Sequence, residues 1–184
     1  RRLFLPESIA DGFLERLVKA YPKVPIGDPL DENTLMGPLI DEGAVDDMMN
    51  ALEQAKAQGG EVLTGGGRVD RPGSYVEPTI VKGPRDMAIV RDETFAPILY
   101  VIRHRDLAAA IASQNGLPQG LASCIFTTTL REPETFLPAV RTYVGIPNVT
   151  NGSPGAEPGG ALTGQPDTRG ARAAGRAARS GYMR

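Results

Sequence analysis

The chain has 184 residues, a formal net charge of −2 and a hydrophobic share of 41%. This length suffices for one domain with a buried core, and the balanced charge argues against a nucleic-acid partner. No apolar run approaches the ~18 residues that a membrane-spanning helix needs, so we expect no membrane partner. The single cysteine excludes an internal disulfide and is consistent with a reducing, cytoplasmic location.

The first predicted elements are a strand and a helix. We expect a strand over residues 2–5, followed by a helix that Ser8 caps and Pro22 ends. The apolar residues of this helix recur at helical spacing and predict one buried face, made of Ile9, Phe13, Leu14, Leu17, Val18 and Tyr21. The segment 29–39 has the Pro and Gly content of a loop.

A second helix is predicted to begin at Asp41 or Glu42, because a carboxylate is favourable at the positive end of a helix dipole. The pair Gly59-Gly60 is expected to end it, since Gly accepts the left-handed conformation of a helix C-cap. The residues expected on its buried face are Ala44, Val45, Met48, Met49, Leu52 and Ala55. The strands predicted next occupy residues 61–63, 76–81 and 98–102.

The alternation of predicted strands and helices continues to residue 150. Asp106 is expected to cap a helix over residues 107–114, which Asn115-Gly116 closes. Pro133 is placed at the first position of a last helix that Pro138 cuts short. The remaining predicted strands are 121–126, which we expect to be buried, and 144–149. Alternating strands and helices predict an α/β fold with a mainly parallel sheet and helices on both faces.

The composition changes at residue 151, where Gly, Ala and Arg become abundant and apolar periodicity ends. We therefore expect a domain segment over residues 1–150 and a Gly/Ala/Arg-rich, poorly ordered segment over residues 151–184. The basic stretch 169–184 has almost no interleaved aromatic residues, which favours a solvated tail over a nucleic-acid site.

Three features that suggest chemistry have simpler structural interpretations. Cys124 lies in an apolar run without a neighbouring base, so we do not expect it to be a nucleophile. His104, the only histidine, is expected in a solvated loop after a strand, and no metal-ligand cluster is predicted around it. The run Gly65-Gly66-Gly67 lacks the spacing of a phosphate-binding loop, so we predict a tight turn.

The most informative stretch is Glu93-Thr94-Phe95-Ala96-Pro97, which leads into an apolar strand. Glu93 and Phe95 can point the same way from an extended segment, because side chains alternate between faces. A carboxylate beside a ring can hold a sugar: the carboxylate accepts hydrogen bonds from hydroxyl groups, and the ring packs on the apolar face. From these residues alone, an ordinary loop-to-strand junction with a solvated Glu and a core Phe is the alternative.

The pattern Glu-x-Phe-x-Pro resembles the signature of the aldehyde dehydrogenase superfamily, in which Gly usually stands at the position of Ala96. Further segments match the family in order and spacing, most closely its α-aminoadipic semialdehyde dehydrogenase branch. They are Arg1-Arg2-Leu3-Phe4, Ile26-Gly27-Asp28-Pro29, Gly37-Pro38-Leu39, Asp70-Arg71-Pro72-Gly73, Tyr75-Val76-Glu77-Pro78-Thr79-Ile80 and Gln119-Gly120-Leu121.

The resemblance implies oxidation of a small-molecule aldehyde, such as a semialdehyde, to a carboxylate with NAD, or NADP, as cofactor. It assigns Glu93 to the ribose next to the nicotinamide and Phe95 to packing nearby. It also assigns backbone N–H groups of Gly155 and Ala156 to the substrate carboxylate, although Pro154 replaces the Ser of the branch.

The same resemblance places the nucleophilic Cys a few residues before Arg1, and the general-base Glu further upstream. We therefore expect the later part of a catalytic domain, without a catalytic residue of its own and inactive alone. The absence of an initiator Met supports a processed or incomplete chain. A homo-oligomer is implied, a homotetramer in the family. The alternatives are a non-catalytic remnant and a structural subunit that docks on a complete family member.

Overall fold

The computed structural model describes residues 1–84, 86–137, 144, 146–150 and 165–166. The chain divides into two compact units, Arg1–Arg105 and Asp106–Arg184. Within the described residues, no helix is long and apolar enough to cross a membrane.

The first unit is built on a four-stranded sheet with the strand order β1-β4-β3-β2. The strands are β1 (Arg2–Pro6), β4 (Ile98–His104), β3 (Thr79–Lys82) and β2 (Glu61–Thr64). Strands β1, β4 and β3 run parallel, and β2 pairs with β3 in the antiparallel sense. The mainly parallel α/β sheet predicted from the sequence is confirmed.

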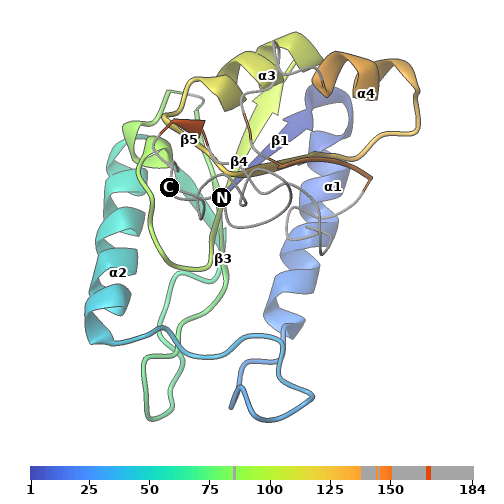
Figure 1. Ribbon diagram of the computed structural model, residues 1–184. Helices are drawn as coiled ribbons and strands as arrows, with labels where there is room; N and C mark the ends of the chain where they lie inside the picture. Colours follow the sequence, from blue (N-terminus) through green and yellow to red (C-terminus); the bar gives the residue numbers. More distant parts are fainter. Residues whose placement is uncertain (85, 138–143, 145, 151–164, 167–184) are drawn as a thin grey trace, which may run out of the picture. The chain divides into compact units, whose positions relative to one another are not determined.

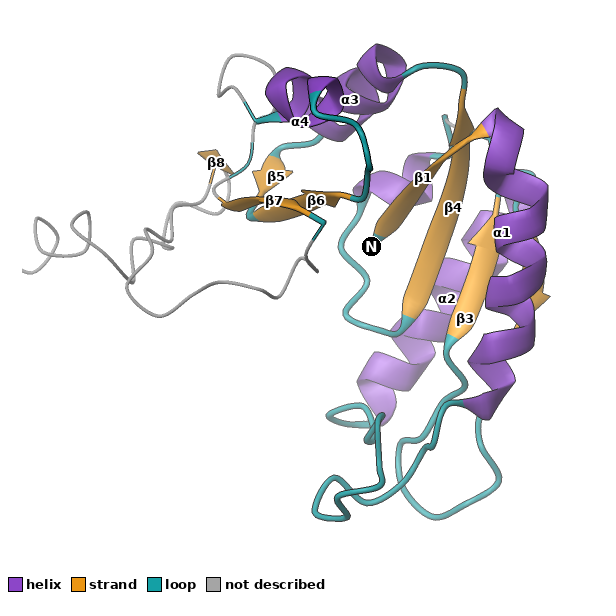
Figure 2. Ribbon diagram, turned by 90° about the vertical axis from the view of Figure 1, so that its right-hand side faces the viewer, coloured by secondary structure: helices purple, strands orange, loops and turns teal. Residues whose placement is uncertain are grey.

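Helices α1 (Glu7–Ala20) and α2 (Glu42–Ala57) cover opposite faces of this sheet (Figures 1 and 2). Leu14 of α1 belongs to a cluster with Ile80 and Val101, whereas α2 packs on the neighbouring residues Val81 and Tyr100. Successive strand residues point to opposite faces, so this alternation divides the core into two layers.

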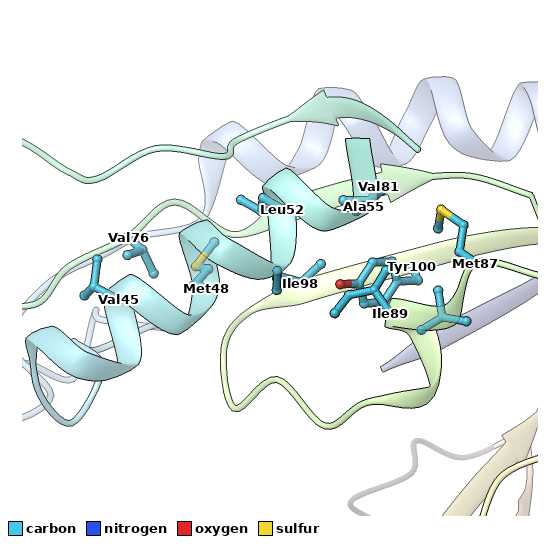
Figure 3. Packing of buried hydrophobic residues seen from close by; sticks show 12 residues of the cluster. Val45, Met48, Leu52, Ala55, Val76, Val81, Met87, Ile89, Ile98 and Tyr100 are labelled. Carbon is cyan, nitrogen blue, oxygen red and sulfur yellow. The ribbon is translucent and has the colours of Figure 1, made fainter. Parts of the chain in front are cut away.

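The layer under α2 is the larger of the two (Figure 3). The helix faces the sheet with Val45, Met48, Ala51, Leu52 and Ala55, all buried. Asp41 caps its N-terminus by accepting a hydrogen bond from the Ala44 N–H at 2.9 Å. Gly59 follows its C-terminus with φ of +87°. Both predicted ends of this helix, and most of its predicted face, are confirmed.

Helix α1 differs from the prediction in two respects. It begins at Glu7 directly after Pro6 and has no side-chain cap, so the prediction of Ser8 as its cap was wrong. Ile9 and Phe13 are 53% and 42% exposed, so they do not belong to the buried face. A helix on a sheet buries only the stripe that faces the strands, and these two residues lie on its flank. The helix ends at Ala20, and Pro22 falls in the 3₁₀ turn η1 (Tyr21–Lys23).

The loop between β2 and β3, residues 65–78, begins with the triple glycine. Gly65 and Gly66 have φ of +74° and +92°, and the Gly66 N–H donates to Thr79 Oγ1 at 2.8 Å. The prediction of a tight turn was wrong, because these glycines begin the long loop 65–78 that leads to β3. Strand β3 begins at Thr79, later than predicted, because Val76 instead forms an isolated bridge with Arg68.

The second unit contains α3 (Leu107–Asn115), β5 (Gln119–Gly120), β6 (Ala122–Ile125), α4 (Arg131–Phe136), β7 (Ile146–Val149) and β8 (Gln165–Pro166). β6 pairs with β7 in parallel, and β5 pairs with β8 in the antiparallel sense. As predicted, Asp106 caps α3 by accepting a hydrogen bond from the Ala109 N–H at 2.7 Å.

Two predictions for this unit were wrong. The segment 121–126 is not a buried strand: β6 is half-buried, and Leu121 and Phe126 are exposed. Among the described residues β6 pairs with β7 alone. A sheet of two strands buries little of either of its faces. Helix α4 begins at Arg131 and not at Pro133, although Pro133 still lies in its first turn. Pro138, and the segment 151–184 apart from β8, lie outside the described residues.

Candidate functional site

The Glu93–Pro97 stretch forms a short loop between the 3₁₀ turn η2 (Ala88–Arg91), which the sequence did not predict, and strand β4. Its start is held by the Asp92 N–H, which donates to the Ile89 carbonyl at 3.2 Å. Its end is held by the Pro97 carbonyl, which accepts from the Thr79 N–H at 2.9 Å. Ile89 and Ile98 are buried in the layer under α2, so the loop is anchored to the core at both ends (Figure 3).

The side chains of this loop alternate in exposure. Glu93 and Phe95 are exposed, Phe95 to 86%, whereas Thr94 between them is half-buried. Phe95 is therefore not a core residue of this chain, whereas the exposed Glu93 agrees with the alternative of a solvated Glu. An exposed carboxylate and an exposed ring two residues apart form a surface that can accept hydroxyl hydrogens and pack against an apolar ring.

Tyr100 of β4 lies beneath this loop and was not singled out by sequence reasoning. It is 3% exposed and belongs to the layer under α2. Burial raises the pKa of its hydroxyl, and the charge of Asp92 adds to this shift. The hydroxyl oxygen itself has no hydrogen-bond partner among the described residues. The one feature of the sequence that points to Tyr100 is a phenol within the otherwise aliphatic run 98–102.

The beginning of β1 lies close to the same loop. The Tyr100 N–H donates to the Arg1 carbonyl at 3.0 Å.

The other residues considered from the sequence are not part of this loop. His104 is the last residue of β4, not part of a loop, because β4 continues in register with β1 as far as the Pro6–His104 pair. Cys124 lies on the half-buried strand β6. Gly155 and Ala156, the predicted substrate anchors, and Pro154 lie outside the described residues. Among the residues that the structure describes, no three His, Cys, Asp or Glu side chains group in a way that could hold a metal ion.

Comparison with known proteins extends over the whole chain. The sequence model described as "Aldehyde dehydrogenase family" matches residues 1–184. Alpha-aminoadipic semialdehyde dehydrogenase of Bos taurus is 46% identical over 185 residues, which are 100% of this chain and 34% of that protein. Aldehyde dehydrogenase family 7 member A1 of Pisum sativum is 44% identical over 187 residues, or 36% of its length. The chain thus spans about a third of the length of these relatives.

Solved structures also match most of this chain and about a third of their own length. A putative aldehyde dehydrogenase from Burkholderia cenocepacia has 35% sequence identity and a TM-score of 0.84, over 91% of this chain and 35% of that one. A double mutant of betaine aldehyde dehydrogenase from Staphylococcus aureus, in complex with NAD+, has 25% identity and a TM-score of 0.90. That match covers 98% of this chain and 37% of the other.

Proposed function

The chain belongs to the aldehyde dehydrogenase family, and we propose that it supplies the nicotinamide side of the active site of an NAD-dependent aldehyde dehydrogenase. The reaction is the oxidation of an aldehyde to a carboxylate, in which a hydride passes to the nicotinamide ring. The chain's own contribution is to bind and orient the cofactor, not to attack the substrate.

The observation that supports this role is that Glu93 and Phe95 are both exposed, on a loop whose two ends are anchored in the core. In this proposal the Glu93 carboxylate accepts hydrogen bonds from the ribose hydroxyls, and the Phe95 ring packs beside the ribose and nicotinamide. The anchored loop lowers the entropy lost on binding, because both side chains start from a fixed backbone.

NAD is the cofactor that the comparisons favour, since betaine aldehyde dehydrogenase of Staphylococcus aureus is solved in complex with NAD+. In this proposal the loop binds the ribose next to the nicotinamide, a part that NAD and NADP share. NADP therefore remains an alternative cofactor for the proposed activity.

The register of β1 supports a nucleophile placed before Arg1 in a longer polypeptide. Arg2 pairs with Tyr100 and Leu3 with Val101 in parallel, so each step back along β1 is a step back along β4. Residues joined ahead of Arg1 would run towards Phe95. A Cys a few residues upstream would then enter the same site, and its thiolate would attack the aldehyde carbonyl.

The substrate class that we propose is a semialdehyde with a second polar end. The support is the identity to alpha-aminoadipic semialdehyde dehydrogenases, 46% for the proteins of Bos taurus and Mus musculus. The backbone N–H groups of Gly155 and Ala156 remain our proposal for the groups that bind the far carboxylate of such a substrate.

The test compares two purified proteins: a full-length protein that contains this chain, and the 184-residue chain alone. With α-aminoadipic semialdehyde and NAD, we expect steady NADH formation from the full-length protein and none from the isolated chain. NADH formation by the isolated chain would contradict the proposal that this chain binds the cofactor but does not attack the substrate. A full-length protein that oxidises no aldehyde would contradict the proposed reaction.

A structural role is the second candidate, and the exposed apolar surface of the first unit favours it. Ile9 and Phe13 of α1 are exposed, as are Leu30, Leu35 and Ile40 in the loop before α2. A contiguous patch of exposed apolar residues is typical of a surface that binds another protein. Co-expression with a complete aldehyde dehydrogenase chain would yield a mixed oligomer if the chain docks there, and separate species if it does not.

A further inference from the structure

We infer that Thr79 is a positioning residue for the cofactor, because it joins the cofactor loop, residues 93–97, to the loop 65–78. This inference rests on the proposed function, since it concerns the loop that carries Glu93 and Phe95. Thr79 is the first residue of β3 and is fully buried, so it acts on the cofactor only through the cofactor loop.

The first observation is the hydrogen bonding of the Thr79 side chain. Its hydroxyl donates to the Glu77 carbonyl at 2.9 Å and accepts from the Gly66 N–H at 2.8 Å. Both bonds are partly buried, so the loss of the hydroxyl would leave two backbone groups without these partners. Since Gly66 and Glu77 lie near opposite ends of the loop 65–78, the hydroxyl holds both ends of that loop against the start of β3.

The second observation is the hydrogen bond between the start of β3 and the cofactor loop. Strands β3 and β4 lie side by side, with Thr79 in register with Ile98 (Figure 2). The Thr79 N–H donates to the Pro97 carbonyl at 2.9 Å. The residue that the loop 65–78 holds by its side chain therefore holds the end of the cofactor loop by its backbone.

The third observation is the tight folding of the cofactor loop itself. The Ala96 N–H donates to the Thr94 carbonyl, and the Ile98 N–H donates to the Ala96 carbonyl, both at 2.8 Å. Each bond joins residues only two positions apart, as in a γ-turn, so this segment has little freedom to bend. A shift of the Pro97 carbonyl is therefore passed on to Phe95. A binding side chain needs to be held within about 0.5 Å of its productive position.

The test measures the NAD affinity and the thermal midpoint of a full-length enzyme that contains this chain. Thr79→Val keeps nearly the shape of the side chain and removes the hydroxyl. We expect it to weaken NAD binding by about threefold to tenfold, the effect of one ordinary hydrogen bond. Thr79→Ser keeps the hydroxyl and should bind NAD as the wild type does.

Leu14→Ala is the control for a loss of stability alone. Leu14 is buried in the layer under α1 with Ile80 and Val101, whereas the cofactor loop packs on the layer under α2 through Ala96. We expect this variant to have a lowered thermal midpoint and unchanged NAD affinity. Thr79→Val with the same outcome, a lowered midpoint and unchanged NAD affinity, would overturn the inference.

The double variant Thr79→Val/Glu93→Gln tests whether Thr79 acts through the cofactor loop. We expect Thr79→Val to weaken NAD binding less when Glu93→Gln has already replaced the carboxylate, because part of its effect is a misplaced Glu93. Strictly additive effects of the two substitutions would overturn the inference. If the wild-type enzyme itself fails to bind NAD, the proposed function fails, which differs from a wild type that binds NAD and a Thr79→Val variant that matches it.

Discussion

Phe95 exposes 86% of its surface on a loop whose two ends are anchored in the core. Full burial of such a side chain is worth about 1.5–3 kcal/mol, so the exposed position forgoes a stabilising contact. A ligand that covers the ring would restore this contact, which supports the proposal that Phe95 packs against the cofactor. The spacing of Glu93 and Phe95 in the sequence predicted that the two side chains point the same way, and the family resemblance assigned them to the cofactor.

Tyr100 could not be predicted from the same pattern. Its hydroxyl oxygen is buried and has no hydrogen-bond partner among the described residues. A Tyr within an apolar strand more often packs as an ordinary core residue. Burial of its hydroxyl beneath the loop is a tertiary property that no periodicity shows.

The prediction at the residue scale concerns the stability of two Gly→Ala variants. Gly65→Ala should destabilise the protein, because Gly65 has φ of +74° and a Cβ would lie 2.4 Å from the Pro78 carbonyl oxygen. We expect a loss of at least about 1–2 kcal/mol from the left-handed backbone alone. Gly12→Ala is the control: it lies within α1 with nothing within 4 Å, and should stabilise by about 0.5–1 kcal/mol. Urea unfolding curves that shift equally for both would contradict this account.

Helix α2 was the element predicted best, because each of its signals agrees with the others. Asp41 caps it, Gly59 follows its end, and Met48 lies at the centre of a periodic apolar face. Helix α1 has an equally regular apolar pattern, but Ile9 and Phe13 proved exposed. Periodicity identifies the helix, whereas the width of its buried stripe depends on how much of the sheet it covers.

The start of α2 is tied to the loop after β2, and this contact gives the prediction at the element scale. Glu42 accepts hydrogen bonds from Arg68 and from Ser74, the latter at 2.8 Å. Arg68 is the larger cause, and Ser74 the second, that hold the pKa of Glu42 below its ordinary value of 4.5. A carboxylate with a lowered pKa stabilises the fold above pH 4.5, and this contribution is lost as the pH falls through the folded-state value.

Glu42→Gln should therefore show a weaker loss of thermal stability than the wild type as the pH falls below about 4.5. Glu53→Gln removes the same charge from an exposed position of α2 and serves as the control. Thermal midpoints measured from pH 6 to pH 3 give the comparison. Identical pH profiles for the wild type and Glu42→Gln would show that the contact contributes nothing to acid stability.

At the scale of the whole molecule, the first unit carries the described part of the candidate site on one sheet. The loop before β4 and the start of β1 meet because these two strands are neighbours in the sheet. The alternation of strands and helices in the sequence predicted that the sheet is mainly parallel. The strand order itself, with β4 between β1 and β3, was not predicted, since local patterns do not specify which strands pair. The predicted anchors Gly155 and Ala156 fall outside the described residues and remain a prediction.

The central claim is that the Glu93 carboxylate binds the cofactor, and a calorimetric titration of NAD tests it most directly. The proteins are a full-length enzyme that contains this chain, its Glu93→Gln variant and the Glu53→Gln control. Loss of a charge-assisted hydrogen bond should weaken NAD binding by about 10-fold to 100-fold in Glu93→Gln and leave the control unchanged. Equal NAD affinity in all three proteins would contradict the claim.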